Sequence, residues 1–148
     1  MSKFYVVTRQ DLSEGLQASQ LLHAARVFQN EHPLIEEVWY RESNTVVLLT
    51  VPGVEQLVSL LDGADRRGIA SSCFVDEDLG CFITAVAFEP GQAASELCRG
   101  LKLAFKEKIC TDSSAAERRA STPVVAGSIP ALCTVKERIR AWFKEIRG

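Results

Sequence analysis

A β-branched and aromatic segment that runs directly into a helical pattern is the feature that most constrains the fold of this chain. Residues 3–9 (KFYVVTR) show no helical period and are typical of a strand. Over about residues 14–31, apolar side chains recur at helical spacing, namely Leu16, Leu21, Leu22, Ala25 and Phe28. Asp11 or Ser13 can cap this helix, and Pro33 marks a stop or a kink. A strand that leads directly into a helix indicates an α/β protein. Such proteins place their chemistry where strands end and helices begin.

The alternation of strands and helices continues along the chain. Residues 44–51 (NTVVLLTV) form a near-continuous apolar run, which predicts a central strand buried on both faces. An amphipathic helix follows and finishes near Gly68. Residues 71–76 and 82–88 then read as two short strands separated by an acidic turn. The pattern therefore predicts four strands.

Two shorter segments are less regular. Residues 34–41 (LIEEVWYR) fit either a short helix or a connector. A short helix is expected at about residues 92–99, before the sequence GLKLAF. We expect one α/β domain over residues 1–110, followed by a linker and a basic amphipathic helix over residues 111–148.

Composition excludes several classes of protein. The 148 residues are 47% hydrophobic and 24% charged, as is usual for one soluble globular domain, and no apolar run is long enough to cross a membrane. No signal peptide is evident, so we expect a cytoplasmic protein with no membrane partner. The five cysteines are odd in number and contain no C-x-x-C pair. They predict neither a disulfide framework nor a zinc site.

Charge divides the chain into two unlike parts. Residues 1–100 contain 7 Lys and Arg against 14 Asp and Glu, whereas residues 101–148 contain 10 against 5. A basic tail is compatible with an anionic partner such as RNA, held by Arg118, Arg119, Lys136, Arg138 and Arg140. The alternative is that these side chains form the solvated face of a surface helix.

The C-terminal segment carries an amphipathic pattern of its own. Residues 111–130 are rich in Ser, Ala and Pro and read as a linker or extended arm. Residues 134–147 place five apolar residues on one face of a predicted helix: Val135, Ile139, Trp142, Phe143 and Ile146. This face either packs on its own domain or docks on another molecule, such as the second subunit of a homodimer.

Several residues together resemble a known family, the archaeal and eukaryotic type 2 peptidyl-tRNA hydrolases. The likeness spans about residues 3–105. It lies in an opening strand that leads into R-x-D-L, a glycine and A-x-Q-x-x-H-A-A: Arg9, Asp11, Leu12, Gly15, Ala18, Gln20, His23, Ala24 and Ala25. It continues through Trp39, the TVVLLTV strand, the E-x-L helix ending before Gly68 and Ile69, the FVD strand end and the T-A-V strand.

The resemblance implies a mixed sheet with helices on both faces and hydrolysis of the ester that joins a peptide to tRNA. It also implies that no metal or organic cofactor takes part. Such a reaction needs an oriented water, stabilisation of an oxyanion and a positive surface for phosphates. In the family pattern the site includes an aspartate after the third strand and threonines around the turn into the fourth. These positions are best matched here by Asp76 and Thr84.

The chain departs from this pattern at the entrance to the first helix. Glu14 occupies the position of the family lysine, and a carboxylate cannot donate to an oxyanion or a phosphate. The turn between Asp76 and Thr84 is shorter than usual and acidic. Either the site is rearranged, or the chain keeps the fold without the activity.

Each candidate residue also has an ordinary structural interpretation. Gln20 and His23 share a broad helix face and can form a polar pair, although a histidine bonded to backbone in the core is equally common. Glu14 can act as a base beside Asp76, or it can simply favour the helix dipole. The acidic run that begins at Asp76 can bind a hard cation or form a solvated turn. Cys73 and Cys81 are ordinary buried thiols unless one pairs with His23.

We therefore expect Asp76, Thr84 and Glu14 as catalytic residues and no metal. Arg9, Gln20 and His23 are expected to line the substrate site. The leading function is hydrolysis of peptidyl-tRNA or a related acyl-RNA ester. The first alternative is a non-catalytic module of the same fold that binds RNA or protein. A second is a hydrolase of a small substrate.

Overall fold

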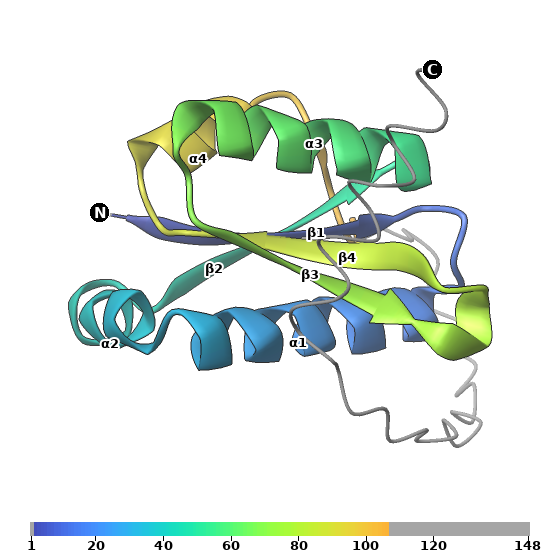
Figure 1. The fold of residues 1–148 in the computed structure, drawn as a ribbon, viewed down its shortest axis with the longest axis horizontal. Helices are drawn as coiled ribbons and strands as arrows, with labels where there is room; N and C mark the ends of the chain where they lie inside the picture. Colours follow the sequence, from blue (N-terminus) through green and yellow to red (C-terminus); the bar gives the residue numbers. More distant parts are fainter. Residues whose placement is uncertain (1, 107–148) are drawn as a thin grey trace, which may run out of the picture.

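Strands and helices alternate along residues 2–106, the part of the chain that a computed structural model describes (Figure 1). In chain order the elements are β1 (Lys3–Arg9), α1 (Glu14–Glu31), α2 (Pro33–Glu42), β2 (Thr45–Val51), α3 (Val54–Arg67), β3 (Ser71–Asp76), a 3₁₀ turn (Glu77–Leu79), β4 (Phe82–Phe88), α4 (Gln92–Leu97) and β5 (Lys102–Leu103). The strands form one mixed sheet of order β3-β4-β1-β2-β5. β1 runs parallel to β2, and the other pairs are antiparallel.

The sheet has five strands, one more than the four that the sequence predicts. The additional strand, β5, pairs Leu103 and Lys102 with residues of β2. Two residues are too few to show an alternating pattern in a sequence, and both side chains of β5 are exposed. This strand is therefore formed by pairing with β2 and not by burial.

The expectation that residues 44–51 form the central, doubly buried strand is also wrong. β1 lies at the centre of the sheet, between β4 and β2. In β2 only Leu49, Thr50 and Val51 are buried, and Val46 is 47% exposed. The short β5 faces only the second half of β2, so the first half lies at an edge. An apolar run does not reveal which of its residues acquire neighbours.

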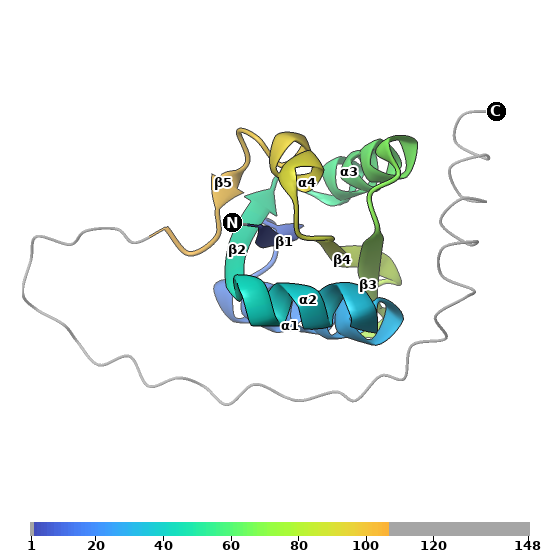
Figure 2. The same ribbon diagram turned by 90° about the vertical axis from the view of Figure 1, so that its left-hand side faces the viewer.

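Helices cover both faces of the sheet, as expected. α3 and α4 lie on one face, whereas α1 and α2 lie on the other (Figures 1 and 2). Successive side chains of β1 enter the two cores in turn: Phe4 and Val6 pack with α1, and Tyr5 and Val7 pack on the opposite face. This period of two follows from the pleat of a strand. It explains why the middle of β1, residues 4–7, is hydrophobic on both faces.

Local signals set the ends of the helices. Ser13, not Asp11, is the N-cap of α1, and its hydroxyl accepts a hydrogen bond from the Leu16 N–H. Pro33 occupies the first turn of α2, so the ambiguous segment at residues 34–41 is a helix. Gly68 ends α3 with φ +66°, a left-handed conformation that favours glycine.

Several expectations fall outside the described residues. These are the linker at residues 111–130, the helix at residues 134–147 and the basic residues from Arg118 to Arg140. Within residues 2–106, no helix is both long enough and apolar enough to span a membrane.

Candidate active site

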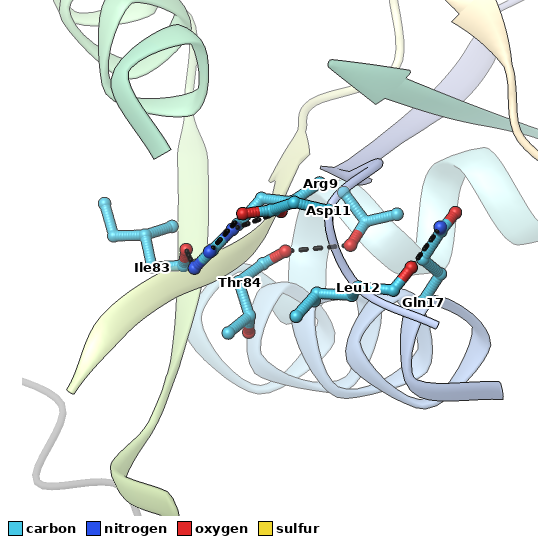
Figure 3. A network of polar contacts seen from close by, with 7 residues as sticks. Arg9, Asp11, Leu12, Gln17, Ile83 and Thr84 are labelled. Atoms are coloured by element: carbon cyan, nitrogen blue, oxygen red, sulfur yellow. Dashed lines mark hydrogen bonds and ion pairs between the residues drawn. The ribbon is translucent and has the colours of Figure 1, made fainter. Parts of the chain in front are cut away.

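The end of β1 is linked to the start of α1 by a short segment that side chains hold in place. The Gln17 amide, buried in α1, donates to the Leu12 carbonyl at 2.7 Å (Figure 3). Arg9, the last residue of β1, forms two hydrogen bonds with the Asp11 carboxylate at 2.9 and 2.6 Å. These contacts set the position from which α1 runs beneath the sheet.

A β-bulge in β4 turns Thr84 toward α1. Phe74 of β3 faces Ala85 of β4, whereas the next residue of β3, Val75, faces Ile83. Thr84 is therefore the extra residue of β4. Without the bulge, strict alternation would place Thr84 and Ala85 on opposite faces of the sheet. With it, the Thr84 hydroxyl lies on the α1 side, where Ala85 also packs.

Gln20 joins Thr84 to Asp76. The Gln20 Nε2 donates to Asp76 Oδ2 at 2.9 Å, and the Thr84 hydroxyl donates to Gln20 Oε1 at 2.5 Å. Only the amide nitrogen can donate to an ionised carboxylate, so this contact determines which way the Gln20 amide points. Gln20 lies 56 positions before Asp76 and 64 positions before Thr84 in the sequence. The packing of α1 against β3 and β4 brings the three residues together. We call this network the Asp76 site.

The three members of the Asp76 site differ in their access to solvent. Thr84 is fully buried and Gln20 is 2% exposed, whereas Asp76 is half-buried at the end of β3. The Thr84 side chain therefore does not reach the protein surface, and its expected role in orienting water and substrate stays a prediction. Of the three, Asp76 alone is placed to touch a substrate. Thr84 and Gln20 can act only by orienting the Asp76 carboxylate.

The turn that follows Asp76 is held by backbone contacts. Asp76 Oδ1 accepts from the Asp78 N–H at 3.0 Å, and the Asp76 carbonyl accepts from the Cys81 N–H at 3.1 Å. Gly80 and Cys81 both have positive φ, which reverses the chain sharply into β4. Among the described residues, no three His, Cys, Asp or Glu side chains gather as metal ligands.

Arg9 brings a positive charge close to Thr84. Its Nη1 lies 3.4 Å from the carbonyl of Ile83, the residue before Thr84, and its side chain is 13% exposed (Figure 3). Asp11 offsets this charge, and the hydrogen bond from Arg9 lowers the pKa of the Asp11 carboxyl below its usual 3.8. An anionic group of a substrate has to compete with Asp11 for the guanidinium.

The Arg9–Asp11 pair makes the free energy of unfolding depend on pH in the acid range. Because the folded-state pKa of Asp11 is lowered, the pair stabilises the fold fully above the unfolded-state value and loses this contribution as pH falls through the folded-state pKa. We expect Asp11→Asn to reduce the free energy of unfolding at neutral pH by less than about 1 kcal/mol, since Asp11 is exposed. Urea unfolding of both proteins at neutral pH and at a pH well below the lowered folded-state pKa of Asp11 checks this. A difference that persists at the lower pH would contradict it.

Glu14 and His23 do not join the Asp76 site. Glu14 is exposed in the first turn of α1, and within residues 2–106 no hydrogen bond connects it to Asp76. His23 lies half-buried with its ring stacked on Phe74, the centroids 4.4 Å apart. The predicted polar pair of Gln20 and His23 is absent, because the Gln20 amide is engaged by Asp76 and Thr84.

Two supporting residues, Thr8 and Phe74, were not predicted from the sequence. Thr8 is fully buried, and its hydroxyl donates to the Thr84 carbonyl at 2.8 Å, which fixes the bulge from β1. Phe74 supplies the ring beneath His23. A threonine that directly follows the run FYVV in a buried strand is a signal that could have found Thr8, because buried polar groups need partners. No comparable signal distinguishes Phe74.

Comparisons with known proteins leave the family open. No protein-family model matches the chain, and a search of curated proteins finds no match. Among solved structures, a protein of unknown function from Agrobacterium tumefaciens strain C58 is similar with a TM-score of 0.46 and 13% sequence identity. That match covers 69% of this chain and 96% of the other. Function therefore has to be inferred from the residues of the site.

Proposed function

We propose that this protein hydrolyses the ester bond of peptidyl-tRNA or a related acyl-RNA ester, with Asp76 as the residue that orients the attacking water. The observation that carries this proposal is the network in which Gln20 joins Thr84 to Asp76. The resemblance to type 2 peptidyl-tRNA hydrolases matches both the aspartate and the threonine to positions of that site. The network thus supports the function from geometry that the motif alone does not contain.

Hydrolysis of an ester requires a water molecule held near the acyl carbonyl by a hydrogen-bond acceptor. Asp76 offers a carboxylate at the protein surface, with one oxygen held by Gln20 and the other by the backbone of Asp78. A carboxylate held on both sides keeps a bound water in one orientation, which lowers the barrier to attack. We assign Thr84 and Gln20 as positioning residues, with Arg9 as the group for an anionic part of the substrate.

The charges near this site favour a second candidate, a non-catalytic module of the same fold. Three exposed acidic side chains lie at the start of α1 and just after the end of β3: Glu14, Glu77 and Asp78. Arg9 is already paired with Asp11. A tRNA backbone is repelled by such a surface unless cations lie elsewhere. The catalytic candidate therefore needs a basic contact away from these acidic side chains, and Arg118 and Arg119 of the tail are candidates for it.

Release of deacylated tRNA from purified peptidyl-tRNA tests the proposal directly. We expect turnover by the full chain, and a loss of about tenfold or more in kcat for Thr84→Val, because the hydroxyl that orients Gln20 is gone. KM should change little, since Thr84 is buried and cannot touch the substrate. Thr84→Ser keeps a hydroxyl and should restore most of the rate.

Two results would count against this proposal. A folded wild-type chain that releases no tRNA, at enzyme in excess over substrate, favours the binding module. Binding that is then insensitive to salt removes RNA as the partner of that module, because contacts with phosphates weaken steeply as salt rises. A Thr84→Val variant with unchanged kcat would instead remove the positioning role while leaving hydrolysis intact.

A further inference from the structure

Exposed apolar side chains gather at the β2 edge of the sheet, on the side that α1 and α2 cover. Leu22 is 66% exposed and Phe105 is 41% exposed, and Val46 lies between these extremes. These three residues line a cavity of about 360 Å³, together with Trp39 and Leu48. We call these five residues the β2-edge groove. Contiguous exposed apolar surface of this kind marks a place that another segment or molecule covers.

The β2-edge groove continues to the point where the described chain ends. A second cavity, of about 510 Å³, shares Val46, Leu48 and Phe105 with the first. Its lining also includes Leu103 of β5 and Lys106. Lys106 is the last described residue, so the remaining C-terminal chain starts at the groove itself.

We propose that residues 134–147 of the same chain dock in the β2-edge groove. As a helix, this segment would be about 21 Å long. One face would carry all of its large apolar residues: Val135, Ile139, Trp142, Phe143 and Ile146. An amphipathic helix is stable in water only when such a face is covered. The groove is an exposed apolar surface, and the segment has an apolar face that must be covered.

The length of the connection favours docking within one chain. Residues 107–133 separate the groove from the segment. Treated as a flexible coil, 27 residues span about 30 Å on average. A tether of this length holds the segment at an effective concentration of the order of millimolar. A second copy of the chain rarely reaches that concentration, so the chain's own segment is the favoured occupant.

Charge acts in the same direction. Residues 2–106 contain nine Lys and Arg against fourteen Asp and Glu, whereas residues 107–148 contain eight against five. At 3.6 residues per turn, Lys136, Arg140 and Arg147 fall together along one side of the apolar face. The charged residues that line the first cavity, Arg26 and Glu36, offset each other, so only the net charges of the two parts count here. The net charges of the two parts therefore attract each other.

Tryptophan fluorescence of the full chain tests this proposal. The chain has two tryptophans, so Trp39→Phe leaves Trp142 as the sole reporter; Trp39 lines the groove but is only 8% exposed, and Phe keeps an aromatic ring at that position. Trp39 Nε1 has no hydrogen-bond partner, and Phe therefore costs no such bond. If the segment docks, Trp142 emission is blue-shifted and acrylamide quenches it several-fold less than free tryptophan. Leu22→Glu in this background should move the emission to longer wavelength and restore quenching.

The control places the same change outside the groove. Leu34→Glu alters a leucine of α2 that is 77% exposed and does not line either cavity, so the emission should stay blue-shifted. Circular dichroism shows whether each variant is folded. Solvent-like emission of Trp142 in the parent protein overturns the proposal, as does blue-shifted emission that Leu22→Glu leaves unchanged. Emission that changes over about a hundredfold dilution also overturns it, because docking within one chain is independent of concentration.

Discussion

Asp76→Asn should lower the rate of peptidyl-tRNA hydrolysis by about a hundredfold or more, the scale of one positioned catalytic base. The substitution keeps the shape of the side chain and removes its negative charge. Gln20 Nε2 and the Asp78 N–H each donate to one oxygen of the carboxylate, whereas an asparagine amide offers a single acceptor oxygen, so one of the two donors would face its NH2 group. The loss should therefore appear in kcat, measured by single-turnover release of deacylated tRNA with the protein shown to be folded.

Glu77→Gln is the matched control for this experiment. Glu77 follows Asp76 directly, is exposed in the 3₁₀ turn and has the same charge to lose. A general effect of acidity on tRNA binding should make both variants bind more tightly, whereas a catalytic role belongs to Asp76 alone. Equal turnover by Asp76→Asn and the wild-type protein would remove Asp76 from the site.

Phe88→Ala should reduce the free energy of unfolding by about 3–5 kcal/mol, the usual cost of removing a buried aromatic side chain. Phe88 ends β4, is fully buried and packs in the core beneath α3 with Leu57 and Val58. The cost combines lost apolar burial with a cavity that the rigid sheet cannot close. Urea unfolding measures it as a shift of the midpoint with little change of slope.

Phe82→Ala provides the comparison on the same strand. Phe82 starts β4 and is 47% exposed, so its loss should change stability by no more than about 0.5 kcal/mol. A similar loss of stability in both variants would contradict an arrangement of β4 in which Phe88 is buried and Phe82 is exposed. The pair separates the contribution of burial from that of an aromatic residue in a strand.

Much of the fold could be predicted because its signals are local. The boundaries of β1, α1, α3, β3 and β4 follow from apolar periodicity, from the Ser13 cap and from glycine at the end of α3. Gln20, Asp76 and Thr84 became candidates through the resemblance to type 2 peptidyl-tRNA hydrolases, which rests on residue types in order along the sequence. Periodicity is visible in a sequence because a helix or strand repeats at a fixed interval.

The remaining features depend on pairing between distant segments. The sequence determined which segments become helices and strands and which residue types are available for a site. The central place of β1, the pairing of β5 at the edge and the bulge at Thr84 become visible only in the folded chain. A bulge arises from the register between two strands, so the residue that turns toward α1 cannot be read from either strand alone. For the same reason only the fold shows that Thr84 is buried, and that Asp76 is the member of the site that reaches solvent.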